Sequence, residues 1–302
     1  MSAHSLPLPA MRRTAPNLNV RGMAPPCSSL VEQALALPCP WSETGAMPLA
    51  VRSVTEDEVA FFQENGWVHL PGLLPAGDAA RLREIATVRL DSRERERRSA
   101  VDRAFGQSRD IAESDPLFRE LALSPVLGRS AARLLHGVAE VRVQVTNLLV
   151  KEPDGGHGPT VFHQDFPWMP MDRSAMLTFW LALADVPAAM GSLRFRTGSH
   201  RHGLLGRSFV RDGDDQPSQH PWLTDLPLSD PLDLAAGDAT VHHALTVHGS
   251  GENRRDTRRL SFTATYFDAD ALYTGAPYGQ TDGLGLTVNR PFDHPKFPKV
   301  GT

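Results

Sequence analysis

The chain has 302 residues, of which 41% are hydrophobic and 22% are charged, and its formal net charge is −4. These values are ordinary for a globular protein, and they exclude a wholly disordered chain and a globally basic protein that coats nucleic acid. No run approaches the roughly eighteen uninterrupted apolar residues of a membrane-spanning helix, so we expect neither a membrane partner nor a nucleic-acid partner.

The two cysteines, Cys27 and Cys39, both lie in the first part of the sequence. This distribution excludes a disulfide framework as the main source of stability, and it argues against a cysteine-based zinc site or a cysteine nucleophile. We therefore expect a cytoplasmic protein.

Residues 1–50 differ in composition from the rest, because they are rich in proline, alanine and serine and carry no sustained amphipathic period. They also lack the apolar stretch of a secretory signal. We expect a disordered N-terminal extension over residues 1–50, followed by a single domain over residues 51–302. A misassigned start is the second explanation, because Met47 directly precedes the first well-formed element.

That first element is a helix beginning after Thr55. Thr55 and Glu58 have the spacing of a capping box, and Gly66 stands where a glycine commonly ends a helix. A short strand is expected over residues 67–70, where aromatic and aliphatic residues precede a Pro-Gly pair. Further along we expect a helix over residues 79–98 and two short helices over residues 115–136, divided at Ser124 and Pro125.

After Gly137 the pattern changes to short runs with a period of two, separated by glycine, proline and aspartate. Such runs in one compact stretch predict an antiparallel sandwich or barrel. A polar, proline-containing segment over residues 206–236 is expected to be a long loop between strands. The expected strands cover residues 141–150, 160–166, 176–183, 192–196, 239–245 and 260–267.

A metal-binding pattern lies at His163 and Asp165. If both residues are on a strand, side chains at i and i+2 point to the same side and present an imidazole and a carboxylate to one point. His248, at the turn after a later predicted strand, supplies a third ligand. Two histidines and one carboxylate suit non-haem Fe(II), although catalytic zinc also takes three protein ligands.

Arg259 follows His248 by eleven residues, on the next predicted strand. It is expected to share a face with Ser261 and Thr263. A guanidinium inside a barrel needs a carboxylate, and a small dicarboxylate cosubstrate would fit, with one end on the metal and the other on Arg259. The alternatives are an ion pair with Asp256 or Glu252, or a surface arginine.

These pieces together resemble a known family. Residues 51–275 are similar to the phytanoyl-CoA dioxygenase family of Fe(II)- and 2-oxoglutarate-dependent oxygenases, and the matching segments follow the family's order. The segments run from Asn65-Gly66-Trp67 through Leu149-Val150-Lys151-Glu152-Pro153, the metal motif at residues 163–165, residues 177–185, the glycine-rich residues 191–203 and His248-Gly249-Ser250, to Arg259.

The resemblance implies a mostly β fold with flanking helices, whose core is a double-stranded β-helix (jelly-roll, cupin-like). It implies that His163, Asp165 and His248 bind the iron, and that Arg259 pairs with the distal carboxylate of 2-oxoglutarate, with Ser250 beside it. Further cosubstrate contacts are implied for Asn147, Trp180, Thr178 and Gln107.

The implied activity is hydroxylation of a small molecule, with O₂ consumed and 2-oxoglutarate converted to succinate and CO₂. Desaturation, epoxidation and ring formation stay open, whereas Asp165 disfavours halogenation because related halogenases carry a small residue there. A biosynthetic or secondary-metabolite substrate is favoured, and the chain is expected to be a monomer or a homodimer. The alternative functions are a non-catalytic metabolite-binding protein of the same fold and a metal-dependent hydrolase.

Other histidines have mostly structural interpretations. His200, His202, His242 and His243 are expected to support the fold or the ligands rather than to bind metal. The segment after the metal motif is expected to border the substrate cavity, and variable loops over residues 96–112, 166–175 and 206–236 are expected to set specificity. The bordering residues named for this role are Trp168, Met169 and Arg173, for which an ordered rim loop is the equal alternative.

Overall fold

The computed structural model describes residues 47–91, 104–154, 156–209 and 215–301. The expectations for residues 1–46, including both cysteines, and for the end of the helix over residues 79–98 fall outside these ranges. Residues from Pro48 onward form one compact unit. None of the helices in the described ranges has the length and apolar composition that crossing a bilayer requires.

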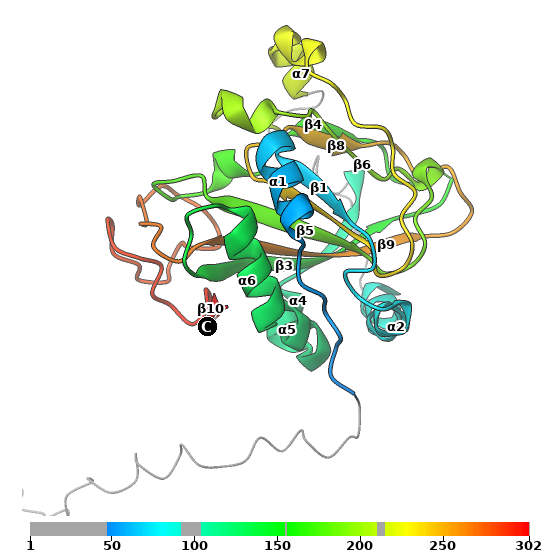
Figure 1. Cartoon of the computed structure of the whole chain (residues 1–302), viewed down its shortest axis with the longest axis horizontal. Helices are drawn as coiled ribbons and strands as arrows, with labels where there is room; N and C mark the ends of the chain where they lie inside the picture. The colour runs from blue at the N-terminus through cyan, green and yellow to red at the C-terminus, as the bar shows by residue number, and fades with distance from the viewer. Residues whose placement is uncertain (1–46, 92–103, 155, 210–214, 302) are drawn as a thin grey trace, which may run out of the picture. The chain divides into compact units, whose positions relative to one another are not determined.

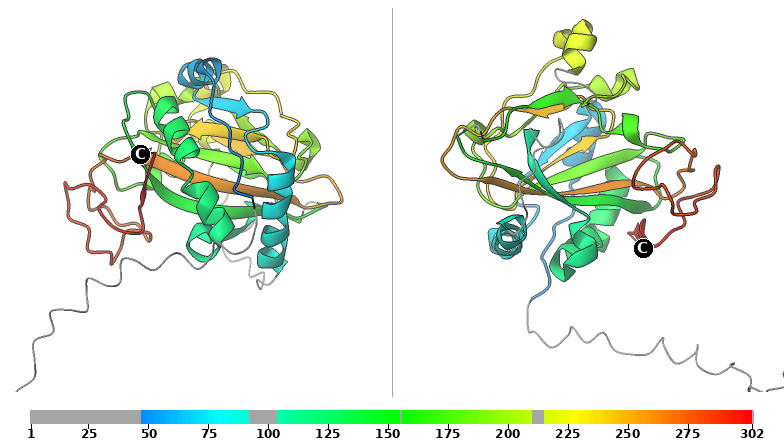
Figure 2. Two further views of the ribbon diagram at one scale, coloured as in Figure 1. Left: turned by 60° about the horizontal axis from the view of Figure 1, so that its bottom comes forward. Right: turned by 180° about the vertical axis from the view of Figure 1, so that it is seen from behind.

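Two antiparallel sheets form the centre of this unit (Figure 1). The right-hand view of Figure 2 shows the larger sheet below the smaller one. The larger sheet has the order β1 (Trp67–Leu70), β7 (Ala239–His243), β5 (Met176–Ala182), β9 (Arg259–Asp268), β3 (Val141–Lys151) and β10 (Lys299–Val300). Strand β2 (Gly106–Arg109) also pairs with β3. The smaller sheet has the order β4 (Thr160–His163), β8 (His248–Ser250) and β6 (Leu193–Phe195). This is the expected jelly-roll arrangement, in which the two sheets face each other around the site.

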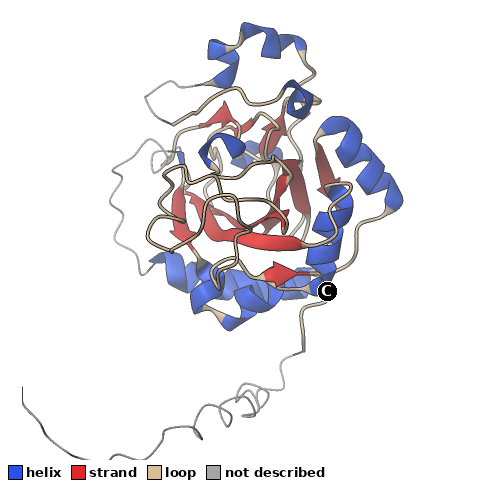
Figure 3. Cartoon of the chain, turned by 90° about the vertical axis from the view of Figure 1, so that its left-hand side faces the viewer, coloured by secondary structure: helices blue, strands red, loops and turns tan. Residues whose placement is uncertain are grey.

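Helices flank the larger sheet on its outer face (Figure 3). The described helices are α1 (Glu56–Asn65), α2 (Ala76–Asp91), α4 (Ile111–Ser114), α5 (Pro116–Ala122), α6 (Pro125–Leu134) and α7 (Gln216–Gln219), with short 3-10 turns at Phe166–Trp168, Ala188–Met190, Ser199–His202 and Pro221–Asp225. The last turn and α7 lie within the segment that was expected to be a loop over residues 206–236.

The start of α1 confirms the predicted capping box. The Thr55 hydroxyl accepts from the Glu58 amide at 3.2 Å, and the Glu58 carboxylate accepts from the Thr55 amide at 2.8 Å. Gly66 ends the helix in the left-handed region with φ of 79°, as glycine readily does.

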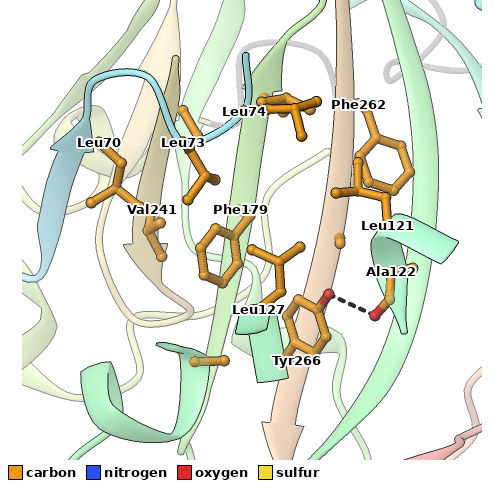
Figure 4. Packing of buried hydrophobic residues seen from close by; sticks show 14 of the residues in the cluster. Leu70, Leu73, Leu74, Leu121, Ala122, Leu127, Phe179, Val241, Phe262 and Tyr266 are labelled. Atoms are coloured by element: carbon orange, nitrogen blue, oxygen red, sulfur yellow. Dashed lines mark hydrogen bonds between the residues drawn. The ribbon is translucent and has the colours of Figure 1, made fainter. Parts of the chain in front are cut away.

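Strand β9 shows how side-chain alternation divides the interior (Figure 4). Phe262 and Tyr266 point toward the helices, where the Phe262 ring lies 5.0 Å from that of Phe118 and the Tyr266 hydroxyl donates to the Ala122 carbonyl at 2.8 Å. Residues two apart share a face, so Arg259 and its successors at every second position point inward instead. The predicted division of this strand into two faces is thus confirmed.

The strand predicted over residues 160–166 is shorter than expected. Strand β4 ends at His163, and Asp165 has helical backbone angles, φ −77° and ψ −35°, at the start of a 3-10 turn. The amides of Asp165 and Phe166 both donate to the Ala244 carbonyl, at 3.0 and 3.1 Å. This contact with a residue far along the chain turns the backbone, so strand alternation is the wrong explanation for the convergence of His163 and Asp165.

Candidate active site

Three potential metal ligands meet where strands β4 and β8 of the smaller sheet pair. His163 at the end of β4 pairs in register with His248 at the start of β8. The ligand atoms of His163, Asp165 and His248 all lie within 4.8 Å of one another, and Asp165 Oδ1 is 3.5 Å from His163 Nε2 and 3.8 Å from His248 Nε2. The structure therefore brings together the three residues that the spacing suggested.

Both imidazoles are oriented by backbone carbonyls. His163 Nδ1 lies 2.8 Å from the Val161 oxygen, and His248 Nδ1 lies 2.9 Å from the Thr246 oxygen. A carbonyl only accepts, so each Nδ1 carries the proton and the lone pair of each Nε2 is left for a metal. This is the arrangement by which outer contacts orient histidine ligands.

The electrostatics of the cluster favour the forms that bind metal. Burial lowers the pKa of His248 well below its usual value, and the neighbouring His242 and His163 lower it further. Burial alone would raise the pKa of Asp165, but the surrounding histidines outweigh it and hold that pKa well below its usual value. Neutral imidazoles and an ionised carboxylate are the protonation states that metal ligation requires.

The second carboxylate oxygen of Asp165 is held by two side chains. His242 Nε2 and the Thr178 hydroxyl each lie 3.2 Å from Asp165 Oδ2, and Thr178 Oγ1 is 3.0 Å from Thr265 Oγ1. Oδ1 is thereby left as a ligand atom beside the Nε2 atoms of His163 and His248. His242 is 2% exposed and holds a ligand rather than joining the cluster, which agrees with its predicted supporting role.

The cluster opens into a cavity of about 450 Å³, and Arg259 lies at the inner end of that cavity. Arg259 is 2% exposed, donates to the Gly191 carbonyl and packs over the Trp180 ring at 5.3 Å. No carboxylate of the described residues pairs with it, so neither Asp256 nor Glu252 serves as its partner. Burial lowers the pKa of Arg259 to about 9, which leaves the guanidinium charged at neutral pH.

Several buried polar atoms at this end lack a hydrogen-bond partner among the described residues. They include Nε of Arg259, Nε1 of Trp180 and Oδ1 of Asn147, and all three residues line the cavity. Buried polar groups are normally paired, so unpaired ones around a cavity point to a polar ligand. Such a ligand would need to carry negative charge beside Arg259.

The remaining predicted cosubstrate contacts divide into two groups. Gln107 on β2 and Thr178 on β5 line the cavity. Ser250 is buried on β8 but is not among the lining residues, and it donates to the hydroxyl of Thr160, which does line the cavity, at 3.1 Å. Ser250 therefore reaches the cavity only through Thr160.

The segment after the metal motif borders the cavity only in part. Trp168 and Met169 line it, as expected. Arg173 does not, because its guanidinium pairs with Asp172 and Asp268 at 2.9 and 3.0 Å. Arg173 fits the alternative, an ordered rim loop, because two acids hold its guanidinium.

The histidines of the glycine-rich segment lie outside the metal cluster. The His200 ring is 5.8 Å from that of His243, and the His202 ring is 4.6 Å from that of Trp222. In the described part of the chain, His163, Asp165 and His248 are the one cluster that could hold a metal.

Lys151 is a buried residue beside Arg259 that the sequence analysis did not assign. It is paired in register with Arg259, and its Nζ donates to the carbonyls of Gly158 and Gly251 at 2.7 and 2.8 Å. Burial, and then the charge of Arg259, lowers the pKa of Lys151 to about 6. In the sequence, the signal for this residue was a lysine that directly follows the apolar residues 148–150.

Comparisons with known proteins agree with this geometry. "Phytanoyl-CoA dioxygenase 1" of Oryza sativa subsp. japonica is 31% identical over 163 residues, which are 53% of this chain and 56% of the rice protein. The match thus spans little more than half the length of that relative.

Solved structures extend the similarity over more of the chain. The alpha-ketoglutarate-dependent carbocyclase SnoK from nogalamycin biosynthesis has a TM-score of 0.71 and 30% identity, covering 83% of this chain and 99% of SnoK. The epimerase SnoN, in complex with Fe3+, alpha-ketoglutarate and nogalamycin RO, has a TM-score of 0.68 and 31% identity, covering 81% and 97%. The profile of the family described as phytanoyl-CoA dioxygenase (PhyH) matches residues 62–261. Since that profile spans well over half of the sequence, the chain belongs to the phytanoyl-CoA dioxygenase family.

Proposed function

We propose that this protein is an Fe(II)- and 2-oxoglutarate-dependent dioxygenase that hydroxylates a small molecule and releases succinate and CO₂. One observation carries the proposal. The cluster of His163, Asp165 and His248 opens into the same cavity as Arg259, a buried cation without an acidic partner among the described residues.

The donor set fits iron. Two imidazole nitrogens and one carboxylate oxygen on one side of a metal leave the opposite positions open, which is the pattern of non-haem Fe(II) oxygenases. When bound, iron and 2-oxoglutarate supply the oxidising chemistry, in which O₂ gives one oxygen atom to succinate and one to the substrate. SnoN, which is similar to this chain, was solved with Fe3+ and alpha-ketoglutarate.

The residues of the site would have separate roles. His163, Asp165 and His248 would hold the iron, and Arg259 would pair with the distal carboxylate of 2-oxoglutarate. Asn147, Trp180 and Gln107 would contact the cosubstrate, Thr178 would steady Asp165, and Ser250 would act through Thr160.

The type of oxidation depends on where the substrate lies. The carboxylate of Asp165 occupies the metal position that a halide would need, so halogenation is not proposed. SnoK is described as a carbocyclase and SnoN as an epimerase. Ring formation and epimerisation are therefore the second group of outcomes, which share the same oxidising step.

We also propose that the substrate is a free biosynthetic intermediate, and that the protein acts in the cytoplasm as a monomer or homodimer. A cavity of about 450 Å³ has the size of a small-molecule pocket, which supports the substrate class, and the low cysteine content supports the location. Cell fractionation and light scattering test the location and the oligomeric state.

The function is tested by anaerobic loading with Fe(II) and 2-oxoglutarate. We expect one iron per chain, one bound 2-oxoglutarate and the visible charge-transfer absorbance of an Fe(II)–2-oxoacid chelate. Admission of O₂ should then give succinate. Asp165→Ala should lose both the iron and the absorbance.

The same experiment separates the alternatives. A non-catalytic metabolite-binding protein would bind 2-oxoglutarate without forming succinate. A metal-dependent hydrolase would retain zinc after anaerobic purification and would be indifferent to 2-oxoglutarate. Either result contradicts the proposed function.

A further inference from the structure

The cavity is lined by two chemically different sets of side chains. One set, called here the apolar wall, is Trp168, Met169, Met176 and Phe209. The other set, the polar wall, carries hydrogen-bonding side chains from β2, β3 and the segment after β9, namely Arg109, Gln144, Tyr278 and Gln280.

A β-bulge brings Gln144 to the polar wall. In the pairing of β3 with β9, Val143 lies opposite Tyr266 and Val145 lies opposite Thr265, so Gln144 is the extra residue. Bulges re-aim a side chain and often occur next to active sites. Without it, strict alternation would place Val143 and Val145 on one face and Gln144 on the other.

Gln144 organises two further side chains. Its Nε2 donates to the Tyr278 hydroxyl at 3.1 Å and lies 3.5 Å from Gln280 Oε1. The Tyr278 oxygen thus accepts, and its own proton has no acceptor among the described residues. Burial raises the pKa of Tyr278, so the phenol keeps that proton at neutral pH. The hydroxyl of Tyr278 and the amide nitrogen of Gln280 are left as donors toward the cavity.

Arg109 adds a positive charge to this wall. It stands two residues after Gln107 on β2, so both side chains lie on the cavity side of the strand. Arg109 Nε donates to Gln107 Oε1 at 3.2 Å, and no acid in the described ranges forms an ion pair with the guanidinium. The wall therefore offers a cation and neutral donors but no anion.

The apolar wall is suited to a flat apolar body. The Arg207 guanidinium stacks over the Trp168 indole at 4.6 Å and also donates to the Pro167 carbonyl at 3.0 Å. These two contacts fix the indole as part of the cavity wall. Aromatic side chains interact favourably with rings that stack or pack edge-on against them.

We propose that the substrate of the proposed dioxygenase is an apolar, ring-bearing molecule with an anionic oxygen group, which Arg109 and Tyr278 bind while the ring lies against Trp168. This inference rests on the proposed function, since it takes the inner end of the cavity to be filled by 2-oxoglutarate. Arg109 is then a specificity-determining residue at the open end, distinct from Arg259 at the closed end.

The test measures binding rather than turnover. The chain is loaded anaerobically with Fe(II) and saturating 2-oxoglutarate, which blocks Arg259, and is titrated calorimetrically with 2-naphthoate, neutral 2-naphthamide and linear nonanoate. We expect 2-naphthoate to bind at least about tenfold more tightly than either of the other two, because charge-assisted hydrogen bonds are stronger than neutral ones.

Matched variants locate the contact. Arg109→Gln should weaken 2-naphthoate binding by about tenfold or more and leave 2-naphthamide within about twofold, and Tyr278→Phe should weaken 2-naphthoate by a few-fold. Arg129→Gln removes an exposed arginine of α6 that does not line the cavity, and should have no effect on any of the probes.

Each outcome has one meaning. If 2-oxoglutarate does not bind to the iron-loaded chain, the proposed function fails. If it binds but 2-naphthoate shows no binding, no advantage over 2-naphthamide, or no loss with Arg109→Gln, the anionic part of the inference is wrong. Equal binding of nonanoate and 2-naphthoate would overturn the ring-bearing part.

Discussion

Arg259 shows how one position on a strand decides the environment of a charged side chain. Its neighbour Arg258 faces the other side of the chain, where it pairs with Glu152 at 3.0 Å and with Asp91. Adjacent arginines therefore have opposite environments, one paired at the surface and one buried without an acid. This contrast provides an internal control for the role of the buried charge.

The first prediction compares these two arginines. Arg259→Gln should weaken 2-oxoglutarate binding by a factor corresponding to roughly 2–5 kcal/mol, because a charge-assisted contact is removed from a desolvated site. Iron should stay bound. Arg259→Lys should restore only part of the affinity, since an ammonium lacks the planar fork of a guanidinium. Anaerobic titration with 2-oxoglutarate measures the affinity of both variants, and metal analysis measures the bound iron.

Arg258→Gln is the matched control and should change the affinity little, because Arg258 does not line the cavity and its guanidinium pairs with Glu152 and Asp91 instead. Equal effects at positions 258 and 259 would show that the cosubstrate does not distinguish the two faces of the strand. No effect at position 259 would place the cosubstrate elsewhere.

The second prediction concerns His242, which contacts Asp165 Oδ2. His242→Leu removes a hydrogen bond that orients a metal ligand, and outer contacts of this kind typically change metal affinity by about 10–100-fold. We expect weaker Fe(II) binding by that factor, measured by competition with a chelator. His242→Gln, which retains a donor, should recover part of the affinity.

His202→Leu serves as the control for this prediction, because the His202 ring packs on Trp222 away from the metal cluster. Its Fe(II) affinity should match that of the unmodified chain. An unchanged affinity in His242→Leu would mean that Thr178 alone positions Asp165.

At the scale of elements, the alternation of β9 could be read from the sequence, and it correctly separated inward from outward residues. The geometry of the metal motif could not be read in the same way. Asp165 is turned by hydrogen bonds to Ala244, a contact that no local pattern records. His248 likewise begins a separate strand of the smaller sheet, although the sequence placed it after a single run over residues 239–245.

The elements that were missed are short and polar. Strand β2 reads Gly-Gln-Ser-Arg and β8 reads His-Gly-Ser, and neither has an apolar period that would reveal it. Both exist because their backbones pair with β3 and with β4 and β6. These strands carry Gln107 and His248, so sequence periodicity is weakest where the site is built.

The third prediction tests the close approach of Gly191, just before β6, to Gly251, just after β8. Gly191 has φ of 73°, and an added Cβ would lie 2.3 Å from the Gly251 carbonyl oxygen. Gly191→Ala should therefore lower the free energy of unfolding by more than the roughly 1 kcal/mol that a left-handed alanine costs, because backbone must move. Urea denaturation measures this, and 2-oxoglutarate affinity should fall too, since the Gly191 carbonyl accepts from Arg259.

Gly198 is the matched control. It has φ of 80°, but nothing lies within 4 Å of a Cβ added there. Gly198→Ala should show the conformational cost alone and leave the cosubstrate affinity unchanged. If both variants lose the same free energy of unfolding, the close approach of Gly191 to Gly251 adds nothing to the cost of the substitution.

At the scale of the whole molecule, the unit from Pro48 onward has its own core, and its first residues already belong to that core. The Leu49 amide donates to Glu120 at 2.7 Å and the Ala50 amide donates to Asp78 at 3.0 Å. Leu49 and Val51 pack against the main hydrophobic cluster. Residues 49–51 therefore connect to α2 and α5 before α1 begins.

The fourth prediction compares two truncated chains. A chain that starts at Met47 keeps the contacts of Leu49, Ala50 and Val51, so its melting temperature and 2-oxoglutarate-dependent activity should match those of the full chain. A chain that starts at Ser53 loses two partly buried apolar side chains and the Arg52–Glu58 ion pair, whose atoms lie 2.6 Å apart. Burial of two such side chains contributes roughly 2–4 kcal/mol, which corresponds to a melting temperature lower by about 4–16 °C. Differential scanning calorimetry of the three chains checks this order.

A large loss of melting temperature already in the chain that starts at Met47 would show that residues 1–46 stabilise the domain. Equal melting temperatures of all three chains would show that residues 47–52 do not stabilise it.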